Sequence, residues 1–195
     1  QVSKGIGLDQ RIGTRFLQAG LGWGGSCFGK DTAALITTGG DYGLSLPIVQ
    51  AARNVNARQR DRVIEKLLAE CKLLTGKTVG LLGLAFKPDT DDLRDAPALD
   101  LVRRLVRRGV KVRVHDPVAM PLAKLALKDV AVEFCAEAEQ VAVNADAIVL
   151  VTEWATYQSL HWDRMAEQMR QRLVIDGRNA LDRDRLERAG IRCIG

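Results

Sequence analysis

Short apolar runs and longer amphipathic stretches alternate along the second half of the chain. The runs predict strands, and the stretches between them predict helices, for example over Ala98 to Arg108 and Ala136 to Ala142. Strands separated by helices are typical of a parallel sheet covered on both faces, so the predicted fold class is α/β, a doubly wound, Rossmann-like sheet. The candidate strands are Thr78 to Leu84, Val110 to Val114, Val130 to Phe134, Ala147 to Thr152, Leu173 to Asp176 and Ile191 to Ile194.

A long helix is predicted ahead of this sheet, from Pro47 to about Leu74. Pro47 suits a first helical turn, no further Gly or Pro follows until Gly76, and the apolar positions recur at roughly helical spacing. A helix of this length exceeds what one small domain needs. We interpret it as a connector that also contributes to dimer packing.

Residues Gln1 to Gly43 are rich in glycine and irregular in pattern. We therefore expect two parts: residues 1–75, belonging to a central helical or dimerisation domain, and residues 76–195, an α/β domain bearing a ligand at the carboxyl ends of its strands. The first residue is not Met, and we interpret the chain as a fragment.

Composition narrows the class of protein. The 195 residues carry a formal charge of +5, which is compatible with an anionic ligand. No run approaches the roughly 20 apolar residues of a membrane span, and no signal peptide is visible, so we expect no membrane partner and a cytoplasmic location. The basic cluster Arg103, Arg104, Arg107 and Arg108 lacks interleaved aromatic residues, so it is interpreted as a solvated helix face rather than a nucleic-acid site.

The four cysteines show neither C-x-x-C spacing nor a histidine cluster, so we expect no metal site and no disulfide framework. Cys71, Cys135 and Cys193 sit among apolar neighbours and are predicted to be small core residues. Cys27 has a different setting.

Two glycine clusters could each be interpreted as a dinucleotide-binding loop, but neither has the full pattern of such a loop. Gly20, Gly22 and Gly25 spell G-x-G-x-x-G, but residues 11–18 before them do not form a buried-strand pattern. The stretch from Gly80 to Ala85 has the strand-to-helix context and the wrong glycine spacing. We therefore predict no standard NAD pyrophosphate loop at either cluster.

The first cluster instead leads into Gly-Trp-Gly-Gly-Ser-Cys-Phe-Gly-Lys-Asp, residues 22–31. Cys27 follows the glycines at the start of a predicted helix, whose positive end favours a thiolate, and Lys30 adds a cation. From these residues alone two hypotheses stay open: a reactive thiol or a buried structural cysteine.

Several motifs in the same order resemble the UDP-glucose/GDP-mannose dehydrogenase family. They cover essentially the whole chain and look more like the UDP-glucose branch. The resemblance implies an enzyme that oxidises UDP-glucose to UDP-glucuronate in two hydride transfers to NAD, through a thiohemiacetal and a thioester on cysteine. The motifs are residues 22–32, Gly80 to Asp92, Arg94 to Ala98, Val114 to Pro117, Val151 to Trp154 and Asp176 to Asn179.

The resemblance implies that Cys27 is the nucleophile, that Asp31 orients the hydrolytic water, and that Lys30 lies near the thiolate or the cofactor phosphates. Arg94 would reach NAD, and Arg11 would reach the site of a neighbouring subunit in a homodimer or larger oligomer. The remaining substrate-binding residues implied are Phe16, Leu17, Gly22, Trp23, Gly24, Gly25, Phe86, Lys87 and Arg178. His115 and His161 receive no role, and Asp116 is interpreted as a turn residue before Pro117.

Two positions depart from the family pattern: Gly29 replaces a common proline, and Gln18 replaces a lysine of some members. The family's NAD-binding domain is not found in the sequence, so we expect the isolated chain to be inactive. Two alternatives remain. One is a dehydrogenase of the same family acting on GDP-mannose or a UDP-amino sugar, and the other is a non-catalytic nucleotide-binding or dimerisation module with an unreactive Cys27.

Overall fold

The computed structural model describes residues 2–14 and 17–195, and within them six strands form one parallel sheet. The strand order is β3-β2-β1-β4-β5-β6, the order of a doubly wound sheet, which confirms the predicted α/β class. Each predicted strand is present; four are one to two residues shorter than expected, β2 is shifted by one residue, and β5 has the expected bounds. Their bounds are β1 Thr78–Leu82, β2 Lys111–His115, β3 Val132–Phe134, β4 Ala147–Leu150, β5 Leu173–Asp176 and β6 Arg192–Ile194.

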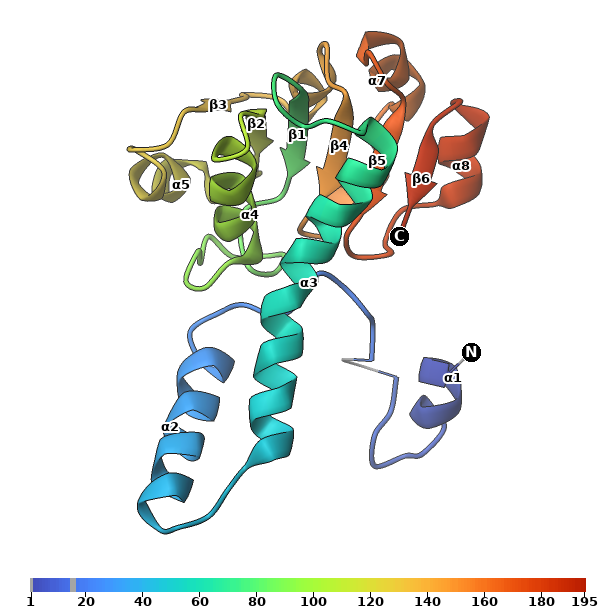
Figure 1. The fold of residues 1–195 in the computed structure, drawn as a ribbon. Helices are drawn as coiled ribbons and strands as arrows, with labels where there is room; N and C mark the ends of the chain where they lie inside the picture. The colour runs from blue at the N-terminus through green and yellow to red at the C-terminus, as the bar shows by residue number, and fades with distance from the viewer. Residues whose placement is uncertain (1, 15–16) are drawn as a thin grey trace.

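Helices cover both faces of the sheet (Figure 1). One apolar cluster joins the sheet to α3, α4 and α5, and a second joins it to the 3₁₀ helix η1 and to α6, α7 and α8. The bounds in the sheet domain are α4 Pro97–Val106, α5 Met120–Ala126, η1 Ala138–Ala142, α6 Ala155–Gln158, α7 Trp162–Gln168 and α8 Arg183–Arg188.

Successive residues of the central strands enter different clusters because side chains alternate across a strand. Leu81 joins the cluster of α3 and α4, whereas Leu82 joins the cluster of α7 and α8, and both are fully buried. Val149 and Leu150 of β4 divide in the same way. A strand buried on both faces must be apolar throughout, which is the pattern in the sequence.

Three helices precede the sheet: α1 Val2–Gly7, α2 Phe28–Asp41 and α3 Pro47–Cys71. The expectation of an irregular segment up to Gly43 is wrong, because α2 occupies residues 28–41. The glycines of this helix led to the wrong prediction, because they suggested an irregular segment. Gly39 is instead a packing residue of the helix: it is buried, and a Cβ there would lie 3.0 Å from a methyl of Leu46. The predicted long helix is confirmed from Pro47, although it ends at Cys71.

Helix α3 runs from the tip of a helical hairpin to the sheet (Figure 1). Its C-terminal half buries Val63, Ile64 and Leu67 in the core, while α2 packs beside its N-terminal half. The carboxyl ends of β1, β4 and β5 therefore face the chain segment that precedes α2. That edge is where an open α/β sheet binds its ligands, at the point where the strand order reverses.

Candidate functional site

The glycine segment 19–25 lies across the carboxyl ends of the strands and is fixed there by backbone hydrogen bonds. The Leu21 N–H donates to the Gly177 carbonyl just after β5, at 2.9 Å. The Gly25 N–H donates to the Arg94 carbonyl in the connection that follows β1, also at 2.9 Å. The segment is thus held at both ends by loops of the sheet domain.

Close contact with protein atoms explains two of the glycines. A Cβ on Gly24 would lie 2.4 Å from the Asp95 carbonyl oxygen. Gly25 has φ +88°, and a Cβ there would meet the Phe86 ring at 2.9 Å. Only glycine fits such positions without displacing the backbone. At these two residues the glycine pattern reflects packing of the segment onto the sheet domain.

Helix α3 holds the middle of the segment through a side chain that sequence reasoning missed. The Asn56 side chain accepts from the Trp23 N–H at 2.8 Å and donates to the Trp23 carbonyl at 3.2 Å. The Arg60 guanidinium donates to the same carbonyl at 3.3 Å. Asn56 is 8% exposed, but one asparagine in a polar helix carries no signal that distinguishes it from a surface residue.

Arg178 contacts four residues from three parts of the site. Its Nε donates to the Val151 carbonyl at 2.8 Å and lies 3.2 Å from the Glu153 carboxylate. Its terminal nitrogens make long hydrogen bonds to the carbonyls of Gly22, at 3.5 Å, and Phe86, at 3.4 Å. The side chain is 16% exposed, so its charge lies within the site rather than on the open surface.

Cys27 forms the N-cap of α2 and is exposed, with its sulfur 3.7 Å from the Ser26 hydroxyl. The pKa of Lys30 is raised chiefly by its hydrogen bond to Asp31, at 2.6 Å, and in small part by the Cys27 charge. The pKa of Arg94 is raised chiefly by its hydrogen bond to Asp92 and again in small part by Cys27. Two cations are therefore within electrostatic reach of the sulfur.

The other three cysteines lie in less accessible settings. Cys135 is buried, whereas Cys71 and Cys193 are half-buried, so the expectation of three core thiols holds fully for Cys135 alone. Burial raises the pKa of Cys71 and Cys135, and raises that of Cys193 to about 11. Cys27 is the exposed member of the four.

The remaining predicted residues divide between the site and the surface. The Lys87 ammonium lies 5.4 Å from the centre of the Phe86 ring, and the Phe86 carbonyl accepts a hydrogen bond from Arg178. Leu17 and Arg178 line a cavity of about 610 Å³ together with residues of α1. Arg11 pairs with Asp9 on the exposed surface, and the predicted Phe16 lies outside the described residues.

Comparison with known proteins gives the family. Residues 80–183 match the model of the UDP-glucose/GDP-mannose dehydrogenase family, UDP binding domain, and residues 1–58 match the central domain of that family. The chain belongs to this family. The two matched stretches meet in the structure where Arg178 contacts Gly22 and where Gly25 bonds to Arg94.

Individual relatives agree with the family models. A UDP-glucose 6-dehydrogenase of Pseudomonas aeruginosa is 44% identical over 91% of this chain and 40% of its own length. The UDP-glucose 6-dehydrogenase TuaD of Bacillus subtilis is 37% identical over 97% of this chain and 41% of its own length. The solved UDP-glucose dehydrogenase of Pyrobaculum islandicum superimposes with a TM-score of 0.87 at 36% identity, covering 100% of this chain and 42% of that one. The chain thus spans about two fifths of these dehydrogenases.

Two features are absent from residues 2–14 and 17–195. No group of three or more potential metal ligands gathers there. None of the helices in that part of the chain combines the length and the apolar character of a membrane span.

Proposed function

We propose that this chain supplies the nucleotide-sugar site and the reactive thiol of an NAD-dependent UDP-glucose 6-dehydrogenase. One observation supports the proposal most strongly. The segment that ends in the exposed Cys27 is joined to the sheet's carboxyl ends through Arg178, which contacts Gly22 and Phe86 at once. A ligand bound at the strand ends therefore lies along the path that leads to the sulfur.

The diphosphate is assigned to the cations of this edge. Arg178 is held by the loop after β4, and Lys87 is a second, exposed cation whose ammonium has no carboxylate partner among the described residues. A guanidinium and an ammonium suit phosphate oxygens as hydrogen-bond donors. The cavity lined by Leu17 and Arg178 takes the nucleoside, and Gly22, Trp23 and Gly24 lie between it and Cys27.

The chemistry assigned to the chain's own residues is covalent. The Cys27 thiolate adds to the C6 aldehyde of the sugar, forming a carbon–sulfur bond while the carbonyl oxygen takes up a proton. Loss of a hydride from this carbon, for which NAD bound elsewhere would be the acceptor, and loss of the hydroxyl proton would leave a thioester. Water attacks the thioester, the carbon–sulfur bond breaks, and the sugar carboxylate and the free thiol are released. Asp31, four residues along α2, orients that water or accepts its proton, and Lys30 offsets the negative charge.

NAD does not fit the sheet of this chain. The Leu84 and Ala85 N–H groups, which follow β1 where a dinucleotide's pyrophosphate would bind, both donate to the buried Asp116 carboxylate, at 2.7 and 3.0 Å. A Cβ at Gly83 would lie 2.4 Å from Thr152, so protein already fills that space. The hydride acceptor therefore binds elsewhere, with Arg94 and Lys30 as the contacts offered from this chain.

A homodimer through the α2–α3 hairpin is part of the proposal. Tyr42, Leu44 and Ile48 at the tip of the hairpin are 80%, 64% and 84% exposed. Three large apolar side chains together on a projecting arm suit a partner surface better than water. A second copy would also bring its Arg11 to this site.

A titration calorimetry comparison tests the substrate. We expect UDP-glucose to bind the full chain more tightly than GDP-mannose, and we expect Arg178→Lys to weaken UDP-glucose about tenfold because the planar fork of donors is lost. Arg188→Lys, on the exposed face of α8, is the control and leaves binding unchanged. Equal affinity for the two nucleotide sugars would contradict the UDP-glucose assignment. The 195 residues alone are expected to form no NADH.

A further inference from the structure

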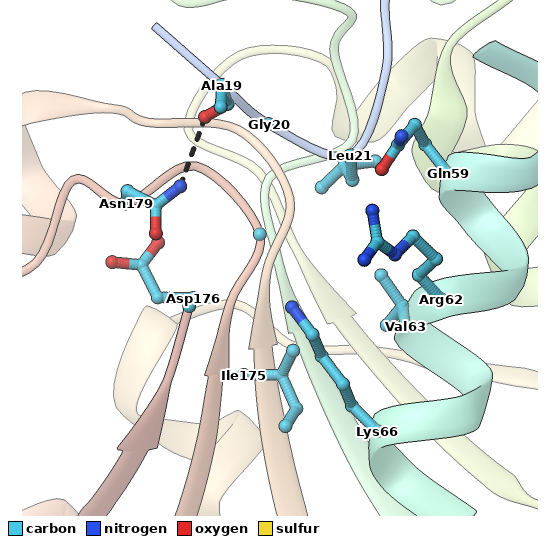
Figure 2. Close-up of a pocket in the computed structure, with 12 residues that line it drawn as sticks. Ala19, Gly20, Leu21, Gln59, Arg62, Val63, Lys66, Ile175, Asp176 and Asn179 are labelled. Carbon is cyan, nitrogen blue, oxygen red and sulfur yellow. Dashed lines mark hydrogen bonds between the residues drawn. The ribbon is translucent and has the colours of Figure 1, made fainter. Parts of the chain in front are cut away.

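A second cavity lies beside the substrate segment, between that segment, helix α3 and the end of β5 (Figure 2). Its volume is about 280 Å³, room for roughly nine waters at about 30 Å³ each. It shares Ala19 and Asn179 with the larger cavity assigned to the nucleoside, but Arg178 lines only the larger one. The two cavities are therefore neighbours separated by residues 19–21.

The second cavity is lined by cations that lack ionic partners. Arg62 and Lys66, one turn apart on α3, both direct their side chains into it (Figure 2). Within the described part of the chain, no carboxylate lies within 4.0 Å of the charged nitrogens of Arg62, Lys66 or Arg183. Lys66 is half-buried and Arg62 is exposed, whereas the half-buried Arg104 pairs with Asp100.

The Asp176 side chain in the cavity wall is already engaged, and Gly195, the last residue of the sequence, also lines the wall. Asp176 is 1% exposed and accepts from the Arg178 N–H at 3.0 Å and from the Leu181 N–H at 2.9 Å. Burial, followed by the charges of Arg62 and Arg183, lowers the pKa of Lys66, and Asp176 only partly opposes this. Like charges one turn apart on a helix repel each other, so the empty arrangement is unfavourable. An anion between these cations would remove that cost.

We propose that this cavity is a binding site for a small phosphorylated anion, held by Lys66 and Arg62 and distinct from the site of the nucleotide sugar. Phosphate oxygens match the donors present: an ammonium, a guanidinium, and the side-chain amide of Gln59. The volume admits a phosphate or pyrophosphate group but not a whole nucleotide sugar. Because the wall includes Ala19, whose carbonyl accepts from the Asn179 side chain at 3.1 Å, the bound anion lies directly behind the substrate segment.

Calorimetric titration of the full chain with inorganic pyrophosphate, in the presence of saturating UDP, tests the proposal. The wild type is expected to bind pyrophosphate with UDP already in place. Lys66→Gln weakens this binding at least about tenfold, the factor for one lost charge-assisted hydrogen bond, and Arg62→Gln weakens it in the same direction. Lys128→Gln, at an exposed position in the loop after α5, is the charge-matched control and binds as the wild type does.

Three results would overturn the proposal: no binding to the wild type, equal affinity for wild type and Lys66→Gln, or complete displacement of pyrophosphate by UDP. The melting temperatures of the wild type and Lys66→Gln, measured without anion, show whether the substitution damages folding. Lys66→Gln is expected to melt no lower than the wild type, because it removes a half-buried cation without a partner. A failure of UDP-glucose to bind would contradict the proposed function without touching this result, since pyrophosphate binding would still be measured.

Discussion

The buried Asp116 carboxylate accepts more hydrogen bonds than its place in the sequence predicts. Its place before Pro117 suggests a turn residue, and the Val118 and Ala119 N–H groups do donate to its Oδ1. The structure adds a larger role. Its Oδ2 accepts from Leu84 and Ala85 after β1 and from the Trp154 indole, at 3.2 Å, so one buried carboxylate joins three loops at the carboxyl edge of the sheet.

Asp116→Asn is predicted to destabilise the protein by about 3 kcal/mol, because an amide has one acceptor oxygen and leaves buried N–H donors unpaired. Urea unfolding followed by circular dichroism measures the change. Asp129→Asn, at an exposed position, is the control and should change stability little. An Asp116 variant as stable as the control would show that these hydrogen bonds contribute little.

Residues of the site could be predicted from sequence only where a motif surrounds them. Cys27, Lys30 and Asp31 lie within one recognisable stretch. Asn56 lies in a segment without such a signal, and its importance comes from tertiary hydrogen bonds to Trp23. A polar side chain that satisfies a distant backbone group has no local pattern, which is why Asn56 was missed.

At the scale of elements, the segment from residue 19 to residue 25 is fixed by hydrogen bonds to its neighbours. It is bonded to the loops after β1 and β5 and to helix α3. The strands were predictable because burial on both faces requires continuous apolar runs. Helix α2 was not, because Gly39 and Gly40 near its end weaken the helical pattern that its packing restores.

Gly24→Ala is predicted to weaken UDP-glucose binding at least about tenfold. The added Cβ would overlap the Asp95 carbonyl and displace residues 19–25 from their position on the sheet domain. Gly40→Ala is the matched control. A Cβ there meets nothing within 4 Å, and alanine in a helix stabilises by up to about 1 kcal/mol. Calorimetric titration of both variants measures the effect. If Gly24→Ala binds UDP-glucose as tightly as the wild type, the position of residues 19–25 does not determine substrate binding, and the prediction is wrong.

At the scale of the whole molecule, a sheet domain and a helical hairpin are joined by one continuous helix, α3 (Figure 1). The hairpin contributes the cysteine, and the sheet contributes Lys87 and Arg178. The boundary expected near residue 75 stays a prediction. The apolar tip of the hairpin stays exposed among residues 2–14 and 17–195, which is the reason for proposing a dimer.

Ile48→Asp is predicted to shift the protein from dimer to monomer, because a charge would have to be desolvated in the interface. Ile48 is 84% exposed in the single chain, so its folding should be unaffected. Sedimentation velocity at a fixed concentration measures the change. Leu125→Asp on α5, at a site 69% exposed, controls for the added charge and should leave the dimer intact. A wild type that sediments as a monomer would contradict the dimer.

The central claim is that the Cys27 sulfur faces the bound nucleotide sugar, and peptide-resolved alkylation by iodoacetamide, with and without UDP-glucose, tests it most directly. Cys71, Cys135 and Cys193 serve as internal references in the same sample. The account predicts that Cys27 is alkylated fastest and that saturating UDP-glucose slows its reaction selectively. Alkylation of Cys27 at the same rate with and without bound UDP-glucose would contradict the account.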